Sequence, residues 1–545
     1  MKRLFECCTG FVQVGVLCMS AGARTPPKAS GTKALGPQIA TLLAPPAVAQ
    51  AHWGIAVTAM DGTPIYSMNE AQLFQPASNA KLFTTAAAMA LLGGGTTFET
   101  RVVAKGVLSA AGTLTGDLYL VGDGDANLSG RTIPYAAPAK GAISTPVIAD
   151  LFRYLDELAE QVVKSGIKRV DGNVIGDDTL FPRELYPEDW AIDDMVWGYG
   201  APISALSIND NQIKVTVTPR ANAGAPAFVT FEPQISFYGI QGFVLTTKAG
   251  SGTDVDFSRE PGSKMLNVAG SIAMDSQPDV EEIAISDPAA YAAAAFIPIL
   301  ESKGIVVSGK TGERNLGMAV HVHGFEAETR EPIADLSYGN FSGDRLRAQF
   351  CFVPVECLRS DERVVASHRS PTLAEDVMVT NKVSQNLHAE LLLRQLAVAY
   401  GINGSIAQGA RVVRAFLTTR AGVDPDDFVF FDGSGLSGHD LVTPRATARL
   451  LQYASTQPWF ADWRRSLPVG GEDGSLMERF AKAPLAGHVF AKTGTLGEAR
   501  ALSGYLDCAS GRTVIFSIMV GNHLPQTHAD RDVMDQIVAA IAATN

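Results

Sequence analysis

Three short motifs, spread over most of the chain, carry side chains that suit one reaction. They are Ser78-Asn79-Ala80-Lys81, Ser384-Gln385-Asn386 and Lys492-Thr493-Gly494-Thr495. Residues 82–383 separate the first two motifs, a stretch longer than most single domains. If one fold brings the three motifs together, the chain must come back to the first motif after this long segment. Most of that segment consists of short strand-like runs separated by turns, and we expect roughly residues 100–360 to be inserted β-rich material.

The first motif brings a hydroxyl and an amine within reach of each other. Ser78 and Lys81 are three residues apart, and residues at that spacing share one face of a helix. A serine hydroxyl is a weak nucleophile that needs an adjacent base. A lysine can be that base if burial or a nearby positive charge lowers its pKa, and Lys492 is the candidate for that charge. We predict Ser78 as the nucleophile and Lys81 as its base.

The second motif supplies a hydroxyl and an amide two residues apart. In an extended backbone, Ser384 and Asn386 would point the same way. Ser384 could then pass a proton between Lys81 and a leaving amine. Asn386 could bind a substrate amide carbonyl and also anchor Lys81. We predict both as catalytic residues.

The third motif is typical of a strand, in which side chains alternate between two faces. Thr493 and Thr495 would share a face and bind a substrate carboxylate, with Lys492 adding positive charge. Gly494 has no side chain and would let the strand lie close to the helix of the nucleophile. The backbone N–H groups of Ser78 and Thr495 could then form an oxyanion hole.

The ordered set resembles the motifs of the penicillin-recognising serine enzymes. Further segments resemble the class C low-molecular-mass penicillin-binding proteins, and the resemblance runs from about residue 50 to the C-terminal part: Gly122-Asp123-Gly124-Asp125, 172–178, 204–207, 432–437 and 467–476. It implies a serine-type D-alanyl-D-alanine carboxypeptidase and/or D,D-endopeptidase. Such a hydrolase acts on peptidoglycan stem peptides and cross-links through an acyl-enzyme, here on Ser78, and binds β-lactams covalently.

The same resemblance implies an α/β (α+β) penicillin-binding/β-lactamase-like catalytic domain, with β-rich domains inserted between the first two motifs. It adds Leu436 as a wall of the site. It also suggests Trp190 and Tyr199, from an inserted domain, as parts of a side-chain subsite, although composition alone allows both to be core aromatics. Gln385 stands where Asp or Asn is common in this family, so we expect altered tuning rather than lost activity.

The texture of the sequence fits this organisation. We predict residues 1–23 as a signal peptide, 24–100 as the N-terminal part of the catalytic domain, 101–360 as two inserted β-rich domains and 361–545 as the C-terminal part. The expected elements are a strand pair at 53–59 and 64–67, helices at 81–92 and 384–400, strands at 489–492 and 514–519, and a last helix after Arg531.

The first 23 residues are typical of an export signal. Lys2 and Arg3 precede an apolar centre at 10–19 and the small-residue site Ala21-Gly22-Ala23. An ordinary flexible N-terminus is the alternative. No stretch after residue 30 is long and apolar enough to span a membrane. We therefore expect an exported protein, in the periplasm or on the outer face of the cell membrane, with at most loose membrane association.

Cleavage of the signal would leave three cysteines. Cys351 and Cys357 could close a short loop in an oxidising compartment, while Cys508 stands alone. Three scattered cysteines without a CxxC pair do not make a zinc site. We expect no metal and no cofactor.

Several features argue against other sites. The formal net charge of −12 disfavours nucleic-acid binding. Residues 304–311 match the phosphate-loop pattern, but Ile305-Val306-Val307 is strand material, so we expect no nucleotide site. Lys310-Thr311-Gly312 and Ser207-Ile208-Asn209 repeat parts of the catalytic motifs inside the insertion and are explained by strand turns. His388 is predicted to start a solvated helix face.

Two other functions compete with the peptidase. A class A β-lactamase would need a Glu-x-x-x-Asn after the second motif to activate the deacylating water, and the sequence has none after Asn386. A catalytically silent wall-binding protein could keep the pocket as a receptor, but every motif side chain is present. Peptidoglycan peptides, with β-lactams as inhibitors, are the expected partners.

Overall fold

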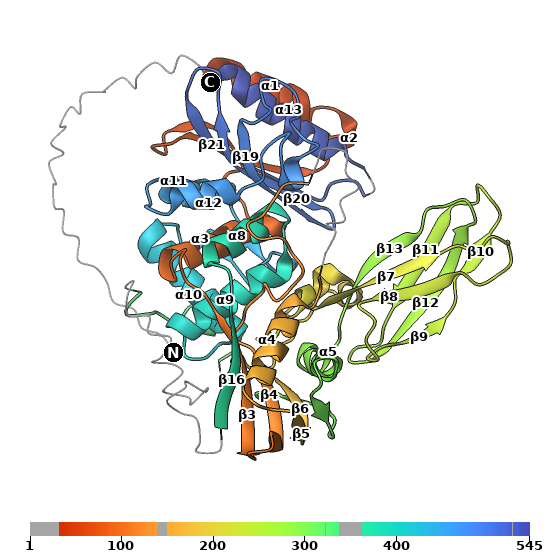
Figure 1. Ribbon diagram of the computed structural model, residues 1–545. Helices are drawn as coiled ribbons and strands as arrows, with labels where there is room; N and C mark the ends of the chain where they lie inside the picture. The colour runs from red at the N-terminus through yellow and green to blue at the C-terminus, as the bar shows by residue number, and fades with distance from the viewer. Residues whose placement is uncertain (1–31, 139–149, 322, 337–361, 526) are drawn as a thin grey trace, which may run out of the picture.

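The computed structural model describes residues 32–138, 150–321, 323–336, 362–525 and 527–545 (Figure 1). The predicted export signal and the pair Cys351 and Cys357 lie outside the described residues. Within those ranges, no helix has both the length and the apolar character needed to cross a bilayer.

A five-stranded antiparallel sheet joins the two ends of the chain. Its order is β19-β20-β21-β1-β2, so the first strand pairs with the last, and Ile55 lies opposite Ile518. Helices α1 (Thr32–Leu43) and α13 (Ala529–Thr544) pack together beside it with a shared apolar core (Figure 1). The strands are β1 (His52–Ala59), β2 (Pro64–Met68), β19 (Val489–Leu496), β20 (Ala499–Asp507) and β21 (Thr513–Gly521).

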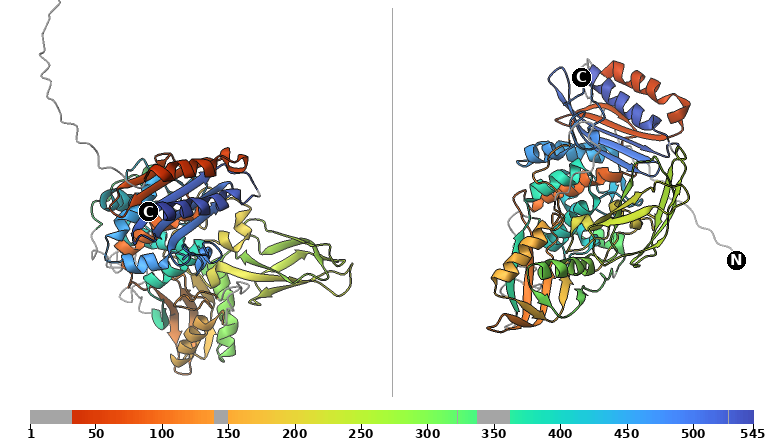
Figure 2. Two further views of the ribbon diagram at one scale, coloured as in Figure 1. Left: turned by 90° about the horizontal axis from the view of Figure 1, so that it is seen from above. Right: turned by 45° about the vertical axis from the view of Figure 1, so that its right-hand side comes forward.

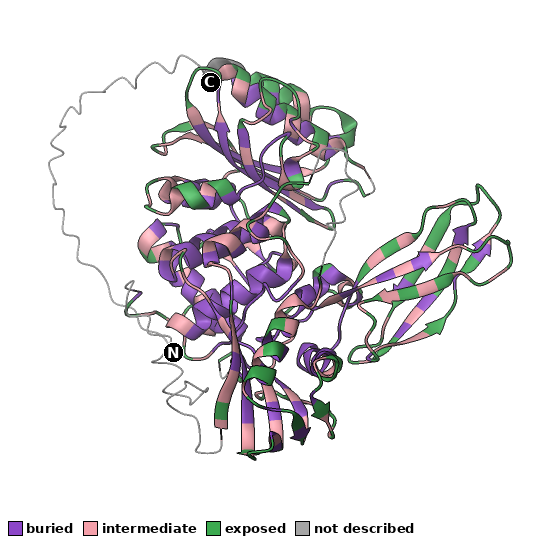
Figure 3. Cartoon of the chain, viewed as in Figure 1, coloured by how far each residue is buried: buried purple, intermediate pink, exposed green. Residues whose placement is uncertain are grey.

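A group of helices lies on the other side of this sheet, and its central members are largely buried (Figure 3). At its centre α3 buries every residue except Ala90. The short apolar and alanine side chains of α3 let neighbouring helices pack closely around it. The helices are α3 (Ala80–Leu91), α8 (Leu373–Lys382), α9 (Asn386–Tyr400), α10 (Ile406–Phe416), α11 (Pro444–Ser455) and α12 (Phe460–Ser466).

Between α3 and α8 the chain forms a second sheet of seven strands. Its edge strand β16 pairs with β3, so the chain closes this sheet just before it returns to the helices. Two helices, α4 (Arg153–Lys164) and α5 (Pro288–Ser302), share an apolar core with it. The strands are β3 (Glu99–Leu108), β4 (Thr113–Val121), β5 (Arg169–Asp171), β6 (Val174–Asp177), β14 (Val306–Val307), β15 (Thr311–Arg314) and β16 (Glu362–Arg369).

A lobe of two further sheets projects from the body of the molecule (Figures 1 and 2). One has the order β13-β7-β8, and the other the order β10-β12-β11 with β9 beside β12. The strands are β7 (Gln212–Thr218), β8 (Phe228–Glu232), β9 (Gly239–Gly242), β10 (Leu245–Thr247), β11 (Thr253–Ser258), β12 (Met265–Ala273) and β13 (Asp279–Ala284).

The segment that resembles a phosphate loop has strand structure. Residues 306 and 307 form β14, and Thr311 begins β15, so a strand follows where a phosphate loop would open a helix. The shorter elements include α2 (Pro46–Ala49), α6 (Phe325–Thr329), β17 (Phe428–Val429) and β18 (Leu441–Val442).

Candidate active site

Ser78 and Lys81 lie at the junction of a short 3-10 turn, Ala77–Asn79, with α3. The amine of Lys81 donates three hydrogen bonds: 2.9 Å to Ser78 Oγ, 2.6 Å to Asn386 Oδ1 and 2.7 Å to the backbone oxygen of Ser434. An ammonium has three N–H donors and no acceptor, so these contacts satisfy it completely. The structure thus brings the first two motifs into direct contact.

Burial is what makes Lys81 able to act as a base. Its side chain is 0% exposed, and desolvation lowers its pKa to about 8 although the negative charges of Asp432, Glu390 and Asp440 oppose the shift. The sequence pointed to Lys492 as the source of the shift. Instead, burial and then the charge of Lys81 hold the pKa of Lys492 well below its usual range.

The second motif has a different backbone from the extended one that the sequence suggested. Ser384 adopts a left-handed conformation with φ of 61°, and Gln385 caps α9, which begins at Asn386 rather than at Ser384. The contact expected between Asn386 and Lys81 is present, whereas Ser384 contacts Lys492 rather than Lys81 among the hydrogen bonds of the described residues. Ser384 Oγ accepts a 2.8 Å hydrogen bond from Lys492 Nζ, and Asn386 Oδ1 contacts Lys81.

Asn386 is held from its other side by the insertion. Its Nδ2 donates a 2.8 Å hydrogen bond to the backbone oxygen of Tyr199. This contact fixes which end of the amide faces Lys81. The Tyr199 side chain is 49% exposed, and its hydroxyl donates to Asp194 at 2.8 Å.

Strand β19 carries the third motif alongside the nucleophile. A Cβ atom at Gly494 would lie 2.7 Å from the backbone oxygen of Pro76 and 3.0 Å from the backbone nitrogen of Ser78. Only glycine permits that approach. Thr493 Oγ1 hydrogen bonds to Ser475 Oγ at 2.7 Å, while Thr495 is exposed.

The loop that contains Leu436 is shaped by one buried carboxylate. Asp432 accepts hydrogen bonds from four successive backbone N–H groups, those of Ser434, Gly435, Leu436 and Ser437. Trp190 Nε1 donates to the same carboxylate at 3.0 Å. Trp190 is only 5% exposed, so it contacts the loop from within and offers little surface to a substrate. The Ser434 carbonyl that this loop presents is the one that Lys81 binds.

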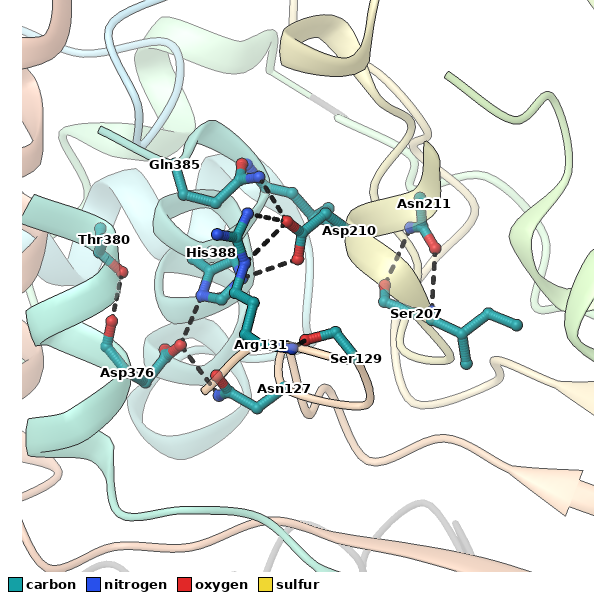
Figure 4. Close-up of polar contacts among 12 residues, drawn as sticks. Asn127, Ser129, Arg131, Ser207, Asp210, Asn211, Asp376, Thr380, Gln385 and His388 are labelled. Atoms are coloured by element: carbon teal, nitrogen blue, oxygen red, sulfur yellow. Dashed lines mark hydrogen bonds and ion pairs between the residues drawn. The ribbon is translucent and has the colours of Figure 1, made fainter. Parts of the chain in front are cut away.

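The prediction for His388 was wrong. It is 0% exposed, and its two ring nitrogens contact Asp376 at 2.6 Å and Asp210 at 3.2 Å (Figure 4). The sequence did contain a signal for burial, because Leu391 and Leu392 follow three and four positions later and share a helix face with His388. Sequence reasoning also missed Asp210, which nothing in its neighbourhood singles out. Within the described ranges, no cluster of three or more His, Cys, Asp or Glu side chains could hold a metal ion.

Comparison with known proteins extends to most of the chain. A family model described as the D-Ala-D-Ala carboxypeptidase 3 (S13) family matches residues 35–321 and 353–544. A D-alanyl-D-alanine carboxypeptidase of Actinomadura sp. (strain R39) is 32% identical over 497 residues, which cover 89% of this chain and 80% of the relative. The D-alanyl-D-alanine carboxypeptidase DacB of Haemophilus influenzae is 24% identical over 457 residues, which cover 83% and 81%.

A solved structure with the same fold is that of penicillin binding protein 4 (dacB) from Haemophilus influenzae. It superposes with a TM-score of 0.73 at 22% identity, over 93% of this chain and 98% of that one. The fold predicted from the sequence, a penicillin-binding catalytic domain with β-rich insertions, is therefore confirmed. With its family model, its relatives and its fold in agreement, the chain belongs to the D-Ala-D-Ala carboxypeptidase 3 (S13) family of serine peptidases.

Proposed function

We propose that this protein is an exported serine D-alanyl-D-alanine carboxypeptidase and/or D,D-endopeptidase that cuts peptidoglycan stem peptides and cross-links through an ester on Ser78. The observation that carries the proposal is the 2.9 Å contact between Ser78 Oγ and the buried amine of Lys81. The other motif side chains support the same function, since Ser384 accepts a hydrogen bond from a second buried lysine, Lys492. The periplasm, or the outer face of the cell membrane with at most loose attachment, is the compartment where such substrates occur.

Acylation begins with proton transfer from Ser78 Oγ to Lys81. When Lys81 is neutral, its two remaining N–H groups can hold Asn386 and the Ser434 carbonyl, which leaves the lone pair directed at the hydroxyl. Ser78 Oγ then attacks the carbonyl carbon of the penultimate D-alanine. The developing oxyanion is assigned to the backbone N–H groups of Ser78 and Thr495.

The second half of the reaction releases the leaving amine. The proton on Lys81 passes through the hydroxyl of Ser384 to the departing nitrogen as the C–N bond breaks. Water then attacks the ester and frees Ser78. Ser384 is half-buried, and its oxygen accepts a 2.8 Å hydrogen bond from Lys492 Nζ, so its own O–H group can donate to the departing nitrogen.

Substrate binding is assigned to the exposed edge of β19. Thr493 and Thr495 would hold the terminal carboxylate, with Lys492 beneath them and Gly494 keeping the strand close to the nucleophile. An anionic ligand raises the pKa of a nearby lysine, so substrate would favour the charged form of Lys492. Leu436 forms a wall, and the exposed ring of Tyr199 lies at the side from which the insertion approaches. Trp190 acts through Asp432 by holding the Leu436 loop.

The pH dependence of acylation follows from the pKa of Lys81. Only the neutral amine can accept the proton of Ser78, and that form predominates above a pKa of about 8. The second-order rate constant for acylation by a β-lactam should therefore rise with pH and level off above about 8. Between that value and the ordinary lysine pKa, the unfolded chain binds a proton that the native site does not, so the contribution of Lys81 to stability also rises with pH. Stopped-flow or quenched labelling between about pH 6 and about pH 10 measures how the acylation rate constant rises with pH. A rate constant that stays unchanged through pH 8 would contradict the assignment of Lys81 as the base.

A fluorescent penicillin tests the proposed function directly. The mature protein should become labelled in a way that survives a denaturing gel, and Ser78→Ala should abolish the label. A diacetyl-Lys-D-Ala-D-Ala peptide should then release D-alanine. Rapid β-lactam turnover without label would favour a β-lactamase instead, and the absence of any reaction would favour a silent wall-binding protein.

A further inference from the structure

A row of four charged side chains, three of them buried and the first, Arg131, half-buried, crosses from the insertion to the helices (Figure 4). Arg131 contacts Asp210 through two guanidinium nitrogens, Asp210 contacts His388 at 3.2 Å, and His388 contacts Asp376 at 2.6 Å. The signs alternate along the row, and the four charges sum to zero. Buried charges are tolerated only when paired in this way.

The geometry favours a positive charge on His388. Each ring nitrogen faces a carboxylate oxygen, and a neutral imidazole has a proton on only one nitrogen. Burial on its own would lower the pKa of His388, but the charge of Asp376 and the hydrogen bonds to Asp210 and Asp376 raise it to about 9. Asn127 Nδ2 also donates to Asp376, at 3.1 Å, and completes that end of the row.

This row reaches the second motif through Gln385. Its Nε2 donates a 3.0 Å hydrogen bond to Asp210, while its Oε1 accepts from the backbone N–H of Leu387 and caps α9. His388 lies on the first turn of the same helix. Asp210 therefore contacts the Ser384–Asn386 turn at Gln385 and the helix that follows it at His388.

The backbone at both ends of this tie is strained. Ser384 has φ of 61°, and Asn209, Asp210 and Asn211 are three successive residues with φ between 50° and 56°. Left-handed conformations of residues other than glycine persist only where the surroundings enforce them, and they concentrate at functional sites. Hydrogen bonds and ion pairs to Asp210 supply that enforcement here.

We propose that Asp210 and His388 are positioning residues for the second motif, which lock the Ser384–Asn386 turn so that Ser384 faces Lys492 and Asn386 faces Lys81. The inference rests on the proposed function of that motif. Neither residue touches the reacting atoms. Their effect is on the geometry of two groups that do, so they should govern the rate of acylation more than the affinity for ligand.

The test compares Asp210→Asn, His388→Gln and Gln385→Glu with the wild type. Gln385→Glu keeps the oxygen that caps α9 but replaces the donor to Asp210 with a second negative group, so it breaks the tie without removing the cap. For benzylpenicillin, each variant should lower the acylation rate constant about 10- to 100-fold, the range expected for a misplaced catalytic group. The noncovalent dissociation constant should change much less. Asp210→Asn combined with His388→Gln should be no slower than the slower single variant, because the pair acts as one unit.

Asp171→Asn is the matched control, since Asp171 pairs with Arg169 on the exposed surface of the same insertion, and it should acylate like the wild type. Thermal unfolding checks that each variant is folded; if Asp210→Asn is not, Gln385→Glu decides. Folded variants that acylate at the wild-type rate, or that lose only affinity, would overturn the inference while leaving the proposed function standing. A wild-type protein that forms no ester with benzylpenicillin would instead overturn the proposed function, and the inference with it.

Discussion

A Lys81→Ala variant should neither form an ester with a β-lactam nor release D-alanine from a stem-peptide analogue. The amine it removes lies 2.9 Å from Ser78 Oγ and also fixes Asn386 and the Ser434 carbonyl around it. Positioned proton transfer contributes about 10²- to 10⁴-fold to a rate, so we expect a loss of about 10³-fold or more in acylation. Labelling with a fluorescent penicillin over a time course, together with D-alanine release, measures both steps.

Lys303→Ala is the control for this substitution. Lys303 forms ion pairs with Asp156 and Glu160 far from the motifs, so its loss removes an amine without touching the site. Surface ion pairs contribute little to stability, and this variant should keep full activity. If Lys81→Ala stays folded and still forms the ester at a comparable rate, another group accepts the Ser78 proton and Lys81 is not the base.

The second large effect should come from a single methyl group at Gly494. In Gly494→Ala the new Cβ would lie 2.7 Å from the backbone oxygen of Pro76 and 3.0 Å from the backbone nitrogen of Ser78. Backbone atoms cannot yield as a flexible side chain can, so β19 must move away from the turn that carries Ser78. The two amide donors assigned to the oxyanion would separate. Loss of one such donor costs about 10²- to 10³-fold in turnover, and we expect a decrease of that size.

Gly95→Ala distinguishes this clash from the general effect of adding a methyl group. A Cβ at Gly95 would have no atom within 4 Å, and the residue does not have a left-handed φ. Its acylation rate should equal that of the wild type. The measurement is the second-order rate constant for benzylpenicillin in all three proteins, and equal rates for Gly494→Ala and Gly95→Ala would show that β19 does not need to lie so close.

The sequence was enough to predict which motifs meet, because each has the chemistry that the others lack. A nucleophile needs a base and a lysine needs burial, so Ser78, Lys81 and Lys492 could be grouped without coordinates. Membership of the family, confirmed by comparison, carried the fold with it. The strand pair β1 and β2 and the apolar helix α3 could also be predicted, since the residue patterns that mark them are local.

What escaped prediction depends on contacts between distant segments. The left-handed turn at Ser384 is followed by two side chains that contact the insertion, Gln385 at Asp210 and Asn386 at Tyr199, and no glycine in the local sequence marks the turn. His388 was predicted to start a solvated helix face, yet its partners Asp210 and Asp376 lie in two other elements. For Trp190 the sequence left open a subsite residue or a core aromatic, and the structure adds a contact that neither reading contained, from its indole N–H to Asp432. In each case a tertiary contact outweighed the local preference.

The order of strands in the five-stranded sheet has a consequence for biosynthesis. The segment that carries Ser78 is synthesised early, whereas β19, β20 and β21 are synthesised late. In the finished sheet β1 pairs with β21, so β1 lacks this partner until the late strands arrive. The inserted segments, the seven-stranded sheet with α4 and α5 and the projecting lobe, share one apolar core that contains none of these three strands, so this core can form before they join. Because Lys492 and the rest of the third motif lie on β19, the group of three motifs is complete only once these late strands have joined the sheet.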